Sequence, residues 1–459
     1  MRTAKNIIIS VILTFIPVFA DVIDTISFVG NTKTKNGYLQ KIIAPFVKSE
    51  YNSDSENLIY KTLDSTNLFS EIMVVTSKKS QNDSVSIFVI VKENSNFSFG
   101  NAGLGLNTME YGEPIGVWLR FNLDVNYSNF LGLGHSLNFT GGLWRERFFG
   151  TNWHIPLGAS PYFFDVGALV GRKPSFVFAW EISPYFNTNV RFGRNIGEKQ
   201  TLFFEISPRF RKYNDMIKNN GEWQIFQSDD FWEIYGKLYY RFSRSDKNYP
   251  PLSATFFSTA LNTNKIMPYV EDGEKKDFWN INTDFKQNIP ISQKIRHSLY
   301  IRSRISATPF GEHNKYDGFL LGGQELLRGW DYEILGSKDS CVFNNSVLGT
   351  LEYQFHIFTF PPIKLGNLLS WYDKSLQKFS PTLAGAVFFD AGYLYKEILS
   401  PLQSTHASAA SAGISLRFLQ PLMRLGGAVE LAWQVAGSER YLNKNRKAPM
   451  LHIGIISQF

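Results

Sequence analysis

The sequence predicts a small α+β domain at residues 21–94, followed by an all-β antiparallel barrel at residues 95–459 with about 16 strands. Three observations lead to this fold class. Helical periodicity is confined to the first segment, and apolar and polar residues alternate along the second. Aromatic residues make up 15% of the chain, yet its mean hydropathy is only −0.16. Apolar side chains interleaved with polar ones produce that combination.

The first twenty residues have the features of a secretory signal peptide. Arg2 and Lys5 give a basic start, an apolar stretch runs from Ile7 to Phe15, and Ala20 is a small residue at a plausible cleavage site. We therefore expect residues 1–20 to be removed on export, and we exclude them from the fold. The alternative interpretation of this segment is a membrane anchor.

The remaining chain has few other means of stabilisation or anchoring. Cys341 is the single cysteine, so no internal disulfide is expected. After residue 20 no apolar run reaches about 18 residues, so no transmembrane helix is expected. The net charge of +7 is spread along the chain without a basic run, which argues against a nucleic-acid partner. A soluble periplasmic protein and an outer-membrane β-barrel both fit these observations.

The segment at residues 21–94 contains the helical signals. Val22–Val29 is typical of a strand, and apolar residues three and four apart predict a helix over residues 37–46. A possible capping box at Ser53–Glu56 begins a second helix. Two further strands are expected at residues 72–77 and 85–91, which gives the order β-α-α-β-β.

From residue 95 onward, apolar and polar residues alternate with a period of two. The pattern is clear at Val117–Val125, Trp279–Lys286, Leu299–Ile305 and Val429–Trp433. In a strand this period places apolar side chains on one face and polar side chains on the other. A soluble β-sandwich would turn the apolar face inward, whereas a membrane barrel would turn it toward lipid.

Other features of this segment favour the transmembrane barrel. The alternating runs are separated by turn-rich stretches and continue to the end of the chain. Paired aromatic residues recur near the ends of the runs, as at Phe148-Phe149 and Tyr239-Tyr240. At about 23 residues for a strand and its connection, residues 97–459 have room for roughly 16 strands.

The last ten residues resemble the terminal strand that marks outer-membrane barrels for assembly. That strand carries a polar residue, a glycine two positions later and a final aromatic residue. His452, Gly454 and Phe459 fit these positions. Ser457 stands where a second aromatic residue is expected, so the match is imperfect.

Two motifs in the first segment are similar to those of a POTRA domain. Phe28-Val29-Gly30-Asn31 looks like the F-x-G-N turn after the first strand, and Leu63–Ile72 resembles the L-x-x-T-x-x-F-x-x-V stretch after the second helix. One such unit before a barrel resembles the BamA/TamA-like outer-membrane assembly and secretion superfamily, which includes the two-partner secretion transporters. BamA-like members usually carry several POTRA domains, so the chain resembles a single-POTRA member.

Four motifs in the second segment extend this resemblance over nearly all of the mature chain. Asn126–Leu137 is similar to the family's N-F-L-G-x-G-x-x-L hairpin. Leu327-Arg328-Gly329-Trp330 resembles the V-R-G-F/Y motif at the tip of the sixth extracellular loop. Glu352-Tyr353 looks like the E-Y/F pair on the next strand, and Phe388–Gly392 resembles the F-x-D-x-G motif. The resemblance implies a periplasmic POTRA domain and a barrel of the bacterial surface antigen type.

The resemblance also implies that the sixth loop folds into the lumen, where Arg328 pairs with Asp390. A guanidinium suits this role because it stays charged and binds a carboxylate through two parallel hydrogen bonds. Gly329 would let the loop turn where a side chain would collide. We expect this loop lock to comprise Leu327, Arg328, Gly329, Trp330, Glu352, Asp390 and Gly392. The alternative is an exposed loop whose ion pair contributes about 0–1 kcal/mol.

A lateral seam is expected where the first barrel strand meets the last. Residues 97–106 contain three glycines, which weaken a strand. A client strand could then pair with the exposed edge. The expected seam residues are Gly100, Gly103, Gly105, His452, Gly454 and Phe459. The alternative role of the three glycines is to accommodate strong barrel curvature.

The function that the resemblance implies is insertion of β-barrel proteins into, or polypeptide translocation across, the outer membrane of a Gram-negative bacterium. Expected partners are unfolded polypeptide clients, outer-membrane lipids and periplasmic accessory proteins. A passive porin and a soluble periplasmic β-sandwich binding protein are the alternatives. The seven histidines are scattered without metal-ligand spacing, and no catalytic motif is present, so no cofactor, metal site or enzymatic activity is expected.

Overall fold

The computed structural model describes most of residues 21–456, and the chain forms two compact units. Not described within that span are residues 53, 67, 79–83, 95–96, 110–115, 145–146, 159, 176–179, 198, 220–221, 247–251, 269–276, 314–317, 323–325, 331–342, 362, 365–377, 399–404, 421–424 and 440–448. The expected signal peptide, Cys341 and Phe459 therefore lie outside the described residues.

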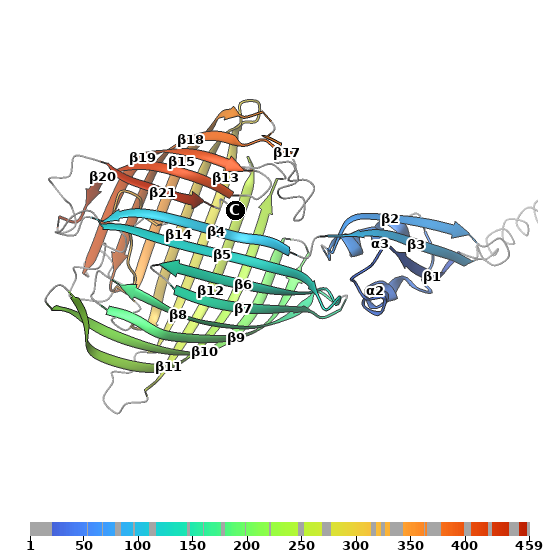
Figure 1. Ribbon diagram of the computed structural model, residues 1–459, viewed down its shortest axis with the longest axis horizontal. Coiled ribbons are helices and arrows are strands. Elements are labelled where there is room, and N and C mark those ends of the chain that lie inside the picture. Colours follow the sequence, from blue (N-terminus) through green and yellow to red (C-terminus); the bar gives the residue numbers. More distant parts are fainter. Residues whose placement is uncertain are drawn as a thin grey trace, which may run out of the picture. The chain divides into compact units, whose positions relative to one another are not determined.

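The first unit contains the β-α-α-β-β order that the sequence predicts (Figure 1). Its elements are β1 (Val22–Val29), α2 (Asn36–Ile43), the 3-10 turn η1 (Ala44–Phe46), α3 (Ser55–Asp64), β2 (Phe69–Lys78) and β3 (Ser84–Glu93). The sheet order is β1-β3-β2, with β1 parallel and β2 antiparallel to β3. The buried faces of the helices and the sheet share one apolar core, which includes Ile23, Leu39, Ile59 and Val85.

The two helices differ in detail from the prediction. The first ends at Ile43 because Pro45 lies in the following 3-10 turn and lacks a backbone N–H donor. Ser53 of the predicted capping box lies outside the described residues, and the N-cap of α3 is Asp54, which makes no side-chain cap hydrogen bond. The carboxylate of Glu56 instead accepts a hydrogen bond from the hydroxyl of Tyr51 at 3.0 Å.

Among the helices of the described residues, none has the length and apolar character needed to cross a membrane.

The N-F-L-G-x-G motif forms a tight turn that belongs to the same compact unit, as residues Ser128–His135. Gly132 and Gly134 both have positive φ angles, of 69° and 70°. A Cβ atom on Gly134 would lie 2.1 Å from the hydroxyl of Tyr38. Buried Asn129 donates from Nδ2 to Oγ1 of Thr34 at 2.8 Å. The glycines of the motif are therefore required both by backbone conformation and by close packing.

The second unit is an antiparallel sheet of sixteen strands that closes into a barrel (Figure 1). Its strands are β4 (Phe97–Met109), β5 (Gly116–Phe130), β6 (His135–Trp144), β7 (Arg147–Pro156), β8 (Tyr162–Ser175), β9 (Trp180–Ile196), β10 (Gln200–Asn219), β11 (Glu222–Ser245), β12 (Ala254–Pro268), β13 (Phe278–Ser292), β14 (His297–Gly311), β15 (Asn345–Thr359), β18 (Thr382–Tyr395), β19 (His406–Gln420), β20 (Leu425–Gly437) and β21 (Met450–Ile456). The short strands β16 (Ile363–Lys364) and β17 (Lys378–Phe379) pair separately between β15 and β18. Consecutive barrel strands are neighbours, and β21 meets β4.

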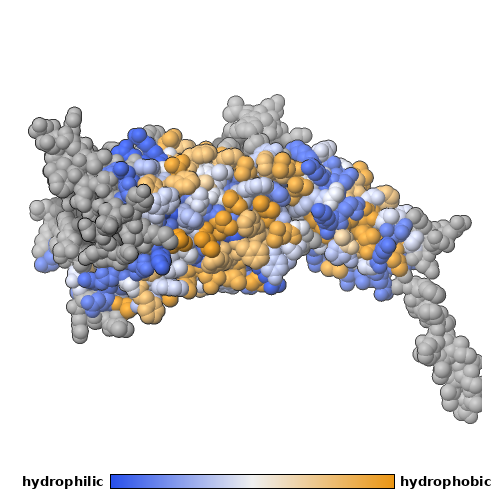
Figure 2. All heavy atoms as spheres, turned by 90° about the horizontal axis from the view of Figure 1, so that it is seen from below, coloured by the Kyte–Doolittle hydropathy of each residue, from blue (hydrophilic) through white to orange (hydrophobic). Residues whose placement is uncertain are grey.

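The apolar face of the alternating strands points outward. On β20, Val429 and Trp433 are 44% and 39% exposed, whereas Glu430 is 2% exposed. On β13, Trp279 is 47% exposed and Asn280 is 2% exposed. Figure 2 shows apolar residues gathered on the outer surface of the barrel. This arrangement is the reverse of a soluble β-sandwich, and an exposed apolar surface of this extent is typical of a barrel surrounded by lipid.

Candidate functional site

The connection between β14 and β15 brings an apolar tip against the inner wall of the barrel. Leu327 and Trp330 of this tip are fully buried. Trp330 donates from Nε1 to the carbonyl oxygen of Ala410 at 3.3 Å. The apolar cluster around them comprises Leu321, Leu327, Trp330, Phe343, Leu348, Leu394, Ala407 and Ala409. Burying side chains as large as Leu327 and Trp330 contributes about 1.5–3 kcal/mol each, so the cluster helps to hold the tip in place.

Arg328 and Asp390 form a bidentate pair inside the barrel. Arg328 donates from Nε to Oδ2 of Asp390 at 2.7 Å and from Nη2 to Oδ1 at 2.8 Å. The backbone N–H of Arg328 also donates to Oδ2, at 3.3 Å. The two residues are 7% and 1% exposed, so this is a buried pair rather than a surface pair. The two residues that the motifs associate are therefore in direct contact.

Gly329 occupies a position that other residues would fit poorly. Its φ angle is +81°, in the left-handed region that side chains with a Cβ atom rarely adopt. An added Cβ would lie 3.1 Å from Cβ of Ser411 and 3.2 Å from Cβ of Ala432. The turn beside Arg328 thus depends on glycine both for its conformation and for its approach to the wall. Gly392 is also closely packed, because an added Cβ would lie 2.8 Å from a methyl group of Leu321.

Three further charged residues complete an ion network with Arg328 and Asp390. Arg328 donates from Nη1 to Glu352 at 3.0 Å and to Glu430 at 3.2 Å. Arg417 donates from Nη1 and Nη2 to the two carboxylate oxygens of Glu352, at 2.5 and 2.7 Å. Its Nη2 lies 3.6 Å from Glu430. The network therefore contains two arginines and three carboxylates, all of them buried.

The network is stable only as a set. Isolated charges are costly to bury, and removing one partner of a buried pair typically costs about 3–5 kcal/mol because the other charge is left uncompensated. Each carboxylate here has an arginine within 4 Å. Arg328 is held from a further side by Phe388, whose ring centre lies 3.4 Å from its Cζ atom. The guanidinium is thus fixed by hydrogen bonds in its plane and by a ring on its face.

Sequence reasoning did not assign Arg417, Glu430 or Phe388 to the site. Glu430 and Arg417 alternate with outward apolar residues, so each could have been recognised as a charge on the inner face of a strand. Nothing in the sequence spacing indicates that these charges meet Arg328, which is 102 residues away from Glu430 along the chain. Only the closed sheet brings them together.

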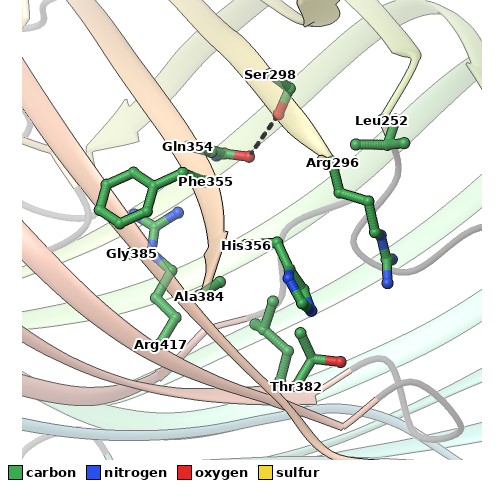
Figure 3. Close-up of a pocket in the computed structure, with 11 residues that line it drawn as sticks. Leu252, Arg296, Ser298, Gln354, Phe355, His356, Thr382, Ala384, Gly385 and Arg417 are labelled. Atoms are coloured by element: carbon green, nitrogen blue, oxygen red, sulfur yellow. Dashed lines mark hydrogen bonds between the residues drawn. The ribbon is translucent and has the colours of Figure 1, made fainter. Parts of the chain in front are cut away.

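A hollow lies beside the network, near the end of the barrel at which β18 begins (Figure 3). Arg417 belongs to the network and also lines the hollow, and Gln354 of the hollow contacts the network. Gln354 donates from Nε2 to Glu352 at 2.6 Å and accepts from Ser298 at 3.4 Å, which is the dashed contact in Figure 3. The other lining residues are Leu252, Arg296, Phe355, His356, Thr382, Ala384, Gly385 and Leu419. The network is therefore bordered by this hollow as well as by the apolar cluster at the loop tip.

Among the described residues, the seam between β4 and β21 consists of three register pairs. These pairs are His452 with Asn107, Ile453 with Leu106, and Gly454 with Gly105. By contrast, β18 pairs with β19 along its whole length, from Thr382 to Tyr395.

The described residues cover only part of the seam expected between residues 97–106 and 450–459. Their register pairs lie at residues 105–107 of β4, and residues 457–459 lie outside the described residues. Gly103 pairs with Asn122 of β5, and Gly100 lies within the register shift between Phe99 and Ala102. That irregularity is consistent with a role for Gly100 in curvature, which was the alternative role for these glycines. Phe459 lies outside the described residues.

His452 connects the seam with the loop lock. It is fully buried on β21, where it is the register partner of both Glu430 and Asn107. Its Nε2 accepts a hydrogen bond from the backbone N–H of Gly329 at 3.1 Å. The loop tip is thus bonded directly to the last strand of the barrel.

Within the part of the chain that the structure describes, no group of three or more His, Cys, Asp or Glu residues could hold a metal ion.

Comparison with known proteins identifies the family. A family model described as the Omp85 superfamily domain matches residues 129–440. BamA from Haemophilus ducreyi lacking POTRA domains 1-3 shares 15% identity and a TM-score of 0.65, over 95% of this chain and 84% of that chain.

Two structures of CdiB are also similar. The protein from Acinetobacter baumannii has 11% identity and a TM-score of 0.58, over 95% of this chain and 74% of that one. The protein from Escherichia coli has 11% identity and a TM-score of 0.53, over 96% and 92%. No curated protein matches the sequence. These structures share the fold, and the family model covers more than half of the chain, which confirms the family that the motifs predict. The chain belongs to the Omp85 superfamily.

Proposed function

We propose that the protein assembles β-barrel proteins in the outer membrane of a Gram-negative bacterium, or translocates polypeptides across that membrane. The observation that carries this proposal is the bond between Gly329 and His452, because it links a fixed loop in the lumen to the strand that closes the barrel. A barrel that serves only as a passive pore has no need of this link. Membership of the Omp85 superfamily supports the same assignment.

The proposed mechanism uses the seam as the site of client entry. Among the described residues, three register pairs join β4 and β21, so few hydrogen bonds would have to break there. Separation of these strands would expose the backbone N–H and C=O groups of both edges, and a client strand could pair with either edge by β-augmentation. The ion network would keep β15, β18 and β20 in place meanwhile, since Arg328 binds a carboxylate on each of these strands.

The first unit is proposed to be a POTRA domain in the periplasm, at residues 21–94. Its sheet order leaves one edge of β1 and one edge of β2 without a neighbouring strand of the described sheet. Because the start of β1 already bonds to residues 48–51, the edge of β2 is the better place for an extended client segment or an accessory protein. The outer face of the barrel would contact outer-membrane lipid. No nucleotide, metal or catalytic step enters the proposal, and client folding and lipid burial would supply the driving force.

A disulfide across the seam tests the mechanism. In a Cys341→Ser background, Leu106→Cys with Ile453→Cys places cysteines on register partners of β4 and β21. Val429→Cys with Ile453→Cys is the matched control, because these partners lie on β20 and β21. We expect oxidation of the seam pair to abolish activity and oxidation of the control pair to preserve it. Full activity of the seam-crosslinked protein would rule out gating at the seam.

Depletion distinguishes this function from that of a porin. After depletion, we expect the amounts of folded outer-membrane proteins or of an exported polypeptide to fall, as measured by quantitative proteomics of the membrane and medium. A porin would instead give solute conductance in planar bilayers, with the other outer-membrane proteins unchanged after depletion.

A further inference from the structure

The lumen face of β9–β14 carries charges that the loop lock does not use. Along β10, Leu202, Phe204 and Ile206 are 39%, 50% and 45% exposed on the outer side, whereas Glu205 and Ser207 are buried. Residues that alternate with the outward ones therefore face the interior. In the ring of strands, β10 lies eight positions from β20, which holds Glu430 of the ion network. β10 is thus opposite β20, and the face extends from there to β14, the neighbour of β15.

Three carboxylates on this face are each in an ion pair with an arginine. The pairs are Arg191 with Glu205 at 2.5 Å, Arg211 with Glu233 at 3.5 Å, and Arg304 with Asp284 at 3.2 Å. These carboxylates also attract Arg209, Lys237 and Lys286, but at longer range than their ion-pair contacts with the arginines.

Arg209, Lys237 and Lys286 lie against aromatic rings instead. Among the described residues, no carboxylate lies within ion-pair distance of any of the three. Arg209 Cζ is 3.6 Å from the ring centre of Tyr235, Lys237 Nζ is 4.8 Å from that of Tyr239, and Lys286 Nζ is 5.2 Å from that of Phe256. A ring face orients a cation without neutralising it, so these three charges stay able to attract an anion.

The strand register places the three cations in a descending row. Arg209 is opposite Glu233 on β11, and Lys237 is four residues further along that strand. Lys237 is the register partner of Asn262 on β12, and Asn262 is in turn the register partner of Asn280 on β13. Lys286 lies six residues after Asn280 along β13. Both displacements run toward the barrel end at which the chain enters β4.

The length of this row indicates what kind of ligand it suits. With about 3.3 Å per residue along a strand and about 4.8 Å between strands, the row extends for roughly 35 Å. A small anion would contact one of the three cations at a time. An extended polypeptide of about ten residues would contact all three.

We propose that Arg209, Lys237 and Lys286, with the rings that hold them, form a lumenal track for acidic segments of an extended polypeptide. The rings add contact area for side chains of any type, and the cations select for Asp and Glu. The inference rests on the proposed function, because the occupant is a client polypeptide. It goes beyond that function by naming the path within the lumen and the charge of the segment that follows it.

Peptide binding to the purified full-length protein in detergent tests the track. The probes are fluorescent decapeptides of alternating Glu and Ser, of alternating Lys and Ser, and of Ser alone, measured by fluorescence anisotropy. We expect the acidic peptide to bind more tightly than both others, and its affinity to fall with salt. Replacing the three cations together (Arg209→Gln, Lys237→Gln, Lys286→Gln) should weaken its binding about tenfold or more, since three charge-assisted contacts are lost.

A matched variant separates the track from overall charge. A variant with Arg194→Gln, Lys212→Gln and Lys265→Gln also loses three cations. Their positions on β9, β10 and β12 alternate with the inward ones, so they lie on the outer face of the barrel. This variant should bind the acidic peptide as tightly as the wild type. Heat-modifiable gel migration confirms that both variants are folded. Equal binding of acidic and basic peptides, or unchanged binding by the track variant, would refute the proposal. Full displacement of the acidic peptide by millimolar inorganic phosphate would also refute it, because it would indicate a site for small anions.

This assay fails or succeeds independently of the proposed function. A protein without peptide preference could still be required for outer-membrane assembly in the depletion experiment. Conversely, normal outer-membrane composition after depletion would overturn the proposed function while leaving the measured peptide preference in place.

Discussion

The backbone N–H of Gly329 donates a hydrogen bond of 3.1 Å to Nε2 of His452. The bond requires a neutral imidazole whose second nitrogen carries the proton. Through it, the loop tip and the last barrel strand are held at one point, next to both the ion network and the seam.

Replacement of His452 tests the link between loop and seam. His452→Gln keeps a hydrogen-bond acceptor of similar reach, whereas His452→Phe keeps a ring and removes the acceptor. Each change is introduced into the protein that carries the seam pair Leu106→Cys and Ile453→Cys. We expect His452→Phe to slow formation of the seam disulfide, because the last strand is held less firmly in register, and His452→Gln to leave the rate unchanged. Identical oxidation rates in all three proteins would show that the loop does not influence the seam.

Removal of Arg328 and Asp390, singly and together, tests their coupling. Each single alanine variant should lose about 3–5 kcal/mol of stability, because a buried charge remains without its main partner. The double variant should be no worse than either single variant. Unfolding temperatures from heat-modifiable gel migration, together with activity, measure these effects. Additive losses would argue that the contact contributes no coupling energy.

Gly329→Ala tests the special position of this glycine. The added methyl group meets a φ angle of +81° and two neighbours at 3.1–3.2 Å, so we expect a loss of about 1–2 kcal/mol and reduced activity. Gly349→Ala on β15 is the control, because nothing lies within 4 Å of its added Cβ atom. If both variants unfold at the same temperature, the turn tolerates a side chain.

Arg417→Gln tests a residue that only the structure assigns to the network. Arg417 binds both carboxylate oxygens of Glu352, so its loss leaves Glu352 with Arg328 and Gln354 alone. We expect a loss of about 3–5 kcal/mol, as for other broken buried pairs. Combining Arg417→Gln with Glu352→Gln should restore part of the unfolding temperature. Absence of any recovery would indicate that the two residues act independently.

The pH dependence of the first unit should follow Glu93. Burial alone would raise the pKa of this carboxyl group, but hydrogen bonds from Thr34, Thr32 and the backbone of Lys33 hold it below its ordinary value of 4.5. A depressed pKa means that Glu93 contributes stability above its unfolded pKa, and that this contribution is lost as the pH falls through its folded pKa. The ordered loop at residues 32–34 should therefore loosen in acid.

Hydrogen exchange of the full-length protein measures this effect. At pH 7, Glu93→Gln should lower the protection of the Lys33 and Thr34 amides about tenfold, since both donate to the carboxylate. Amides of β3 that do not contact Glu93 serve as the internal control. Equal protection of the two loop amides in both proteins would show that the carboxylate charge does not order this loop.

The sequence by itself determined the elements and their faces. Period-two alternation can be read from neighbouring residues alone, which is why Val429 and Trp433 were placed opposite Glu430 correctly. Local signals were also sufficient for β1, whose observed bounds are those predicted. They were insufficient for the start of α3, where Asp54 rather than Ser53 is the N-cap.

Only the tertiary structure decided which charges meet and where the barrel closes. Arg328, Asp390, Arg417 and Glu430 lie on different segments, and their contacts depend on strand order, register and the inward path of one loop. The pairing of residues 105–107 with β21 likewise depends on strand order and register, which local sequence does not specify. Alternation fixes the face of a residue because it is a property of one strand, whereas a contact across the lumen is a property of the closed sheet.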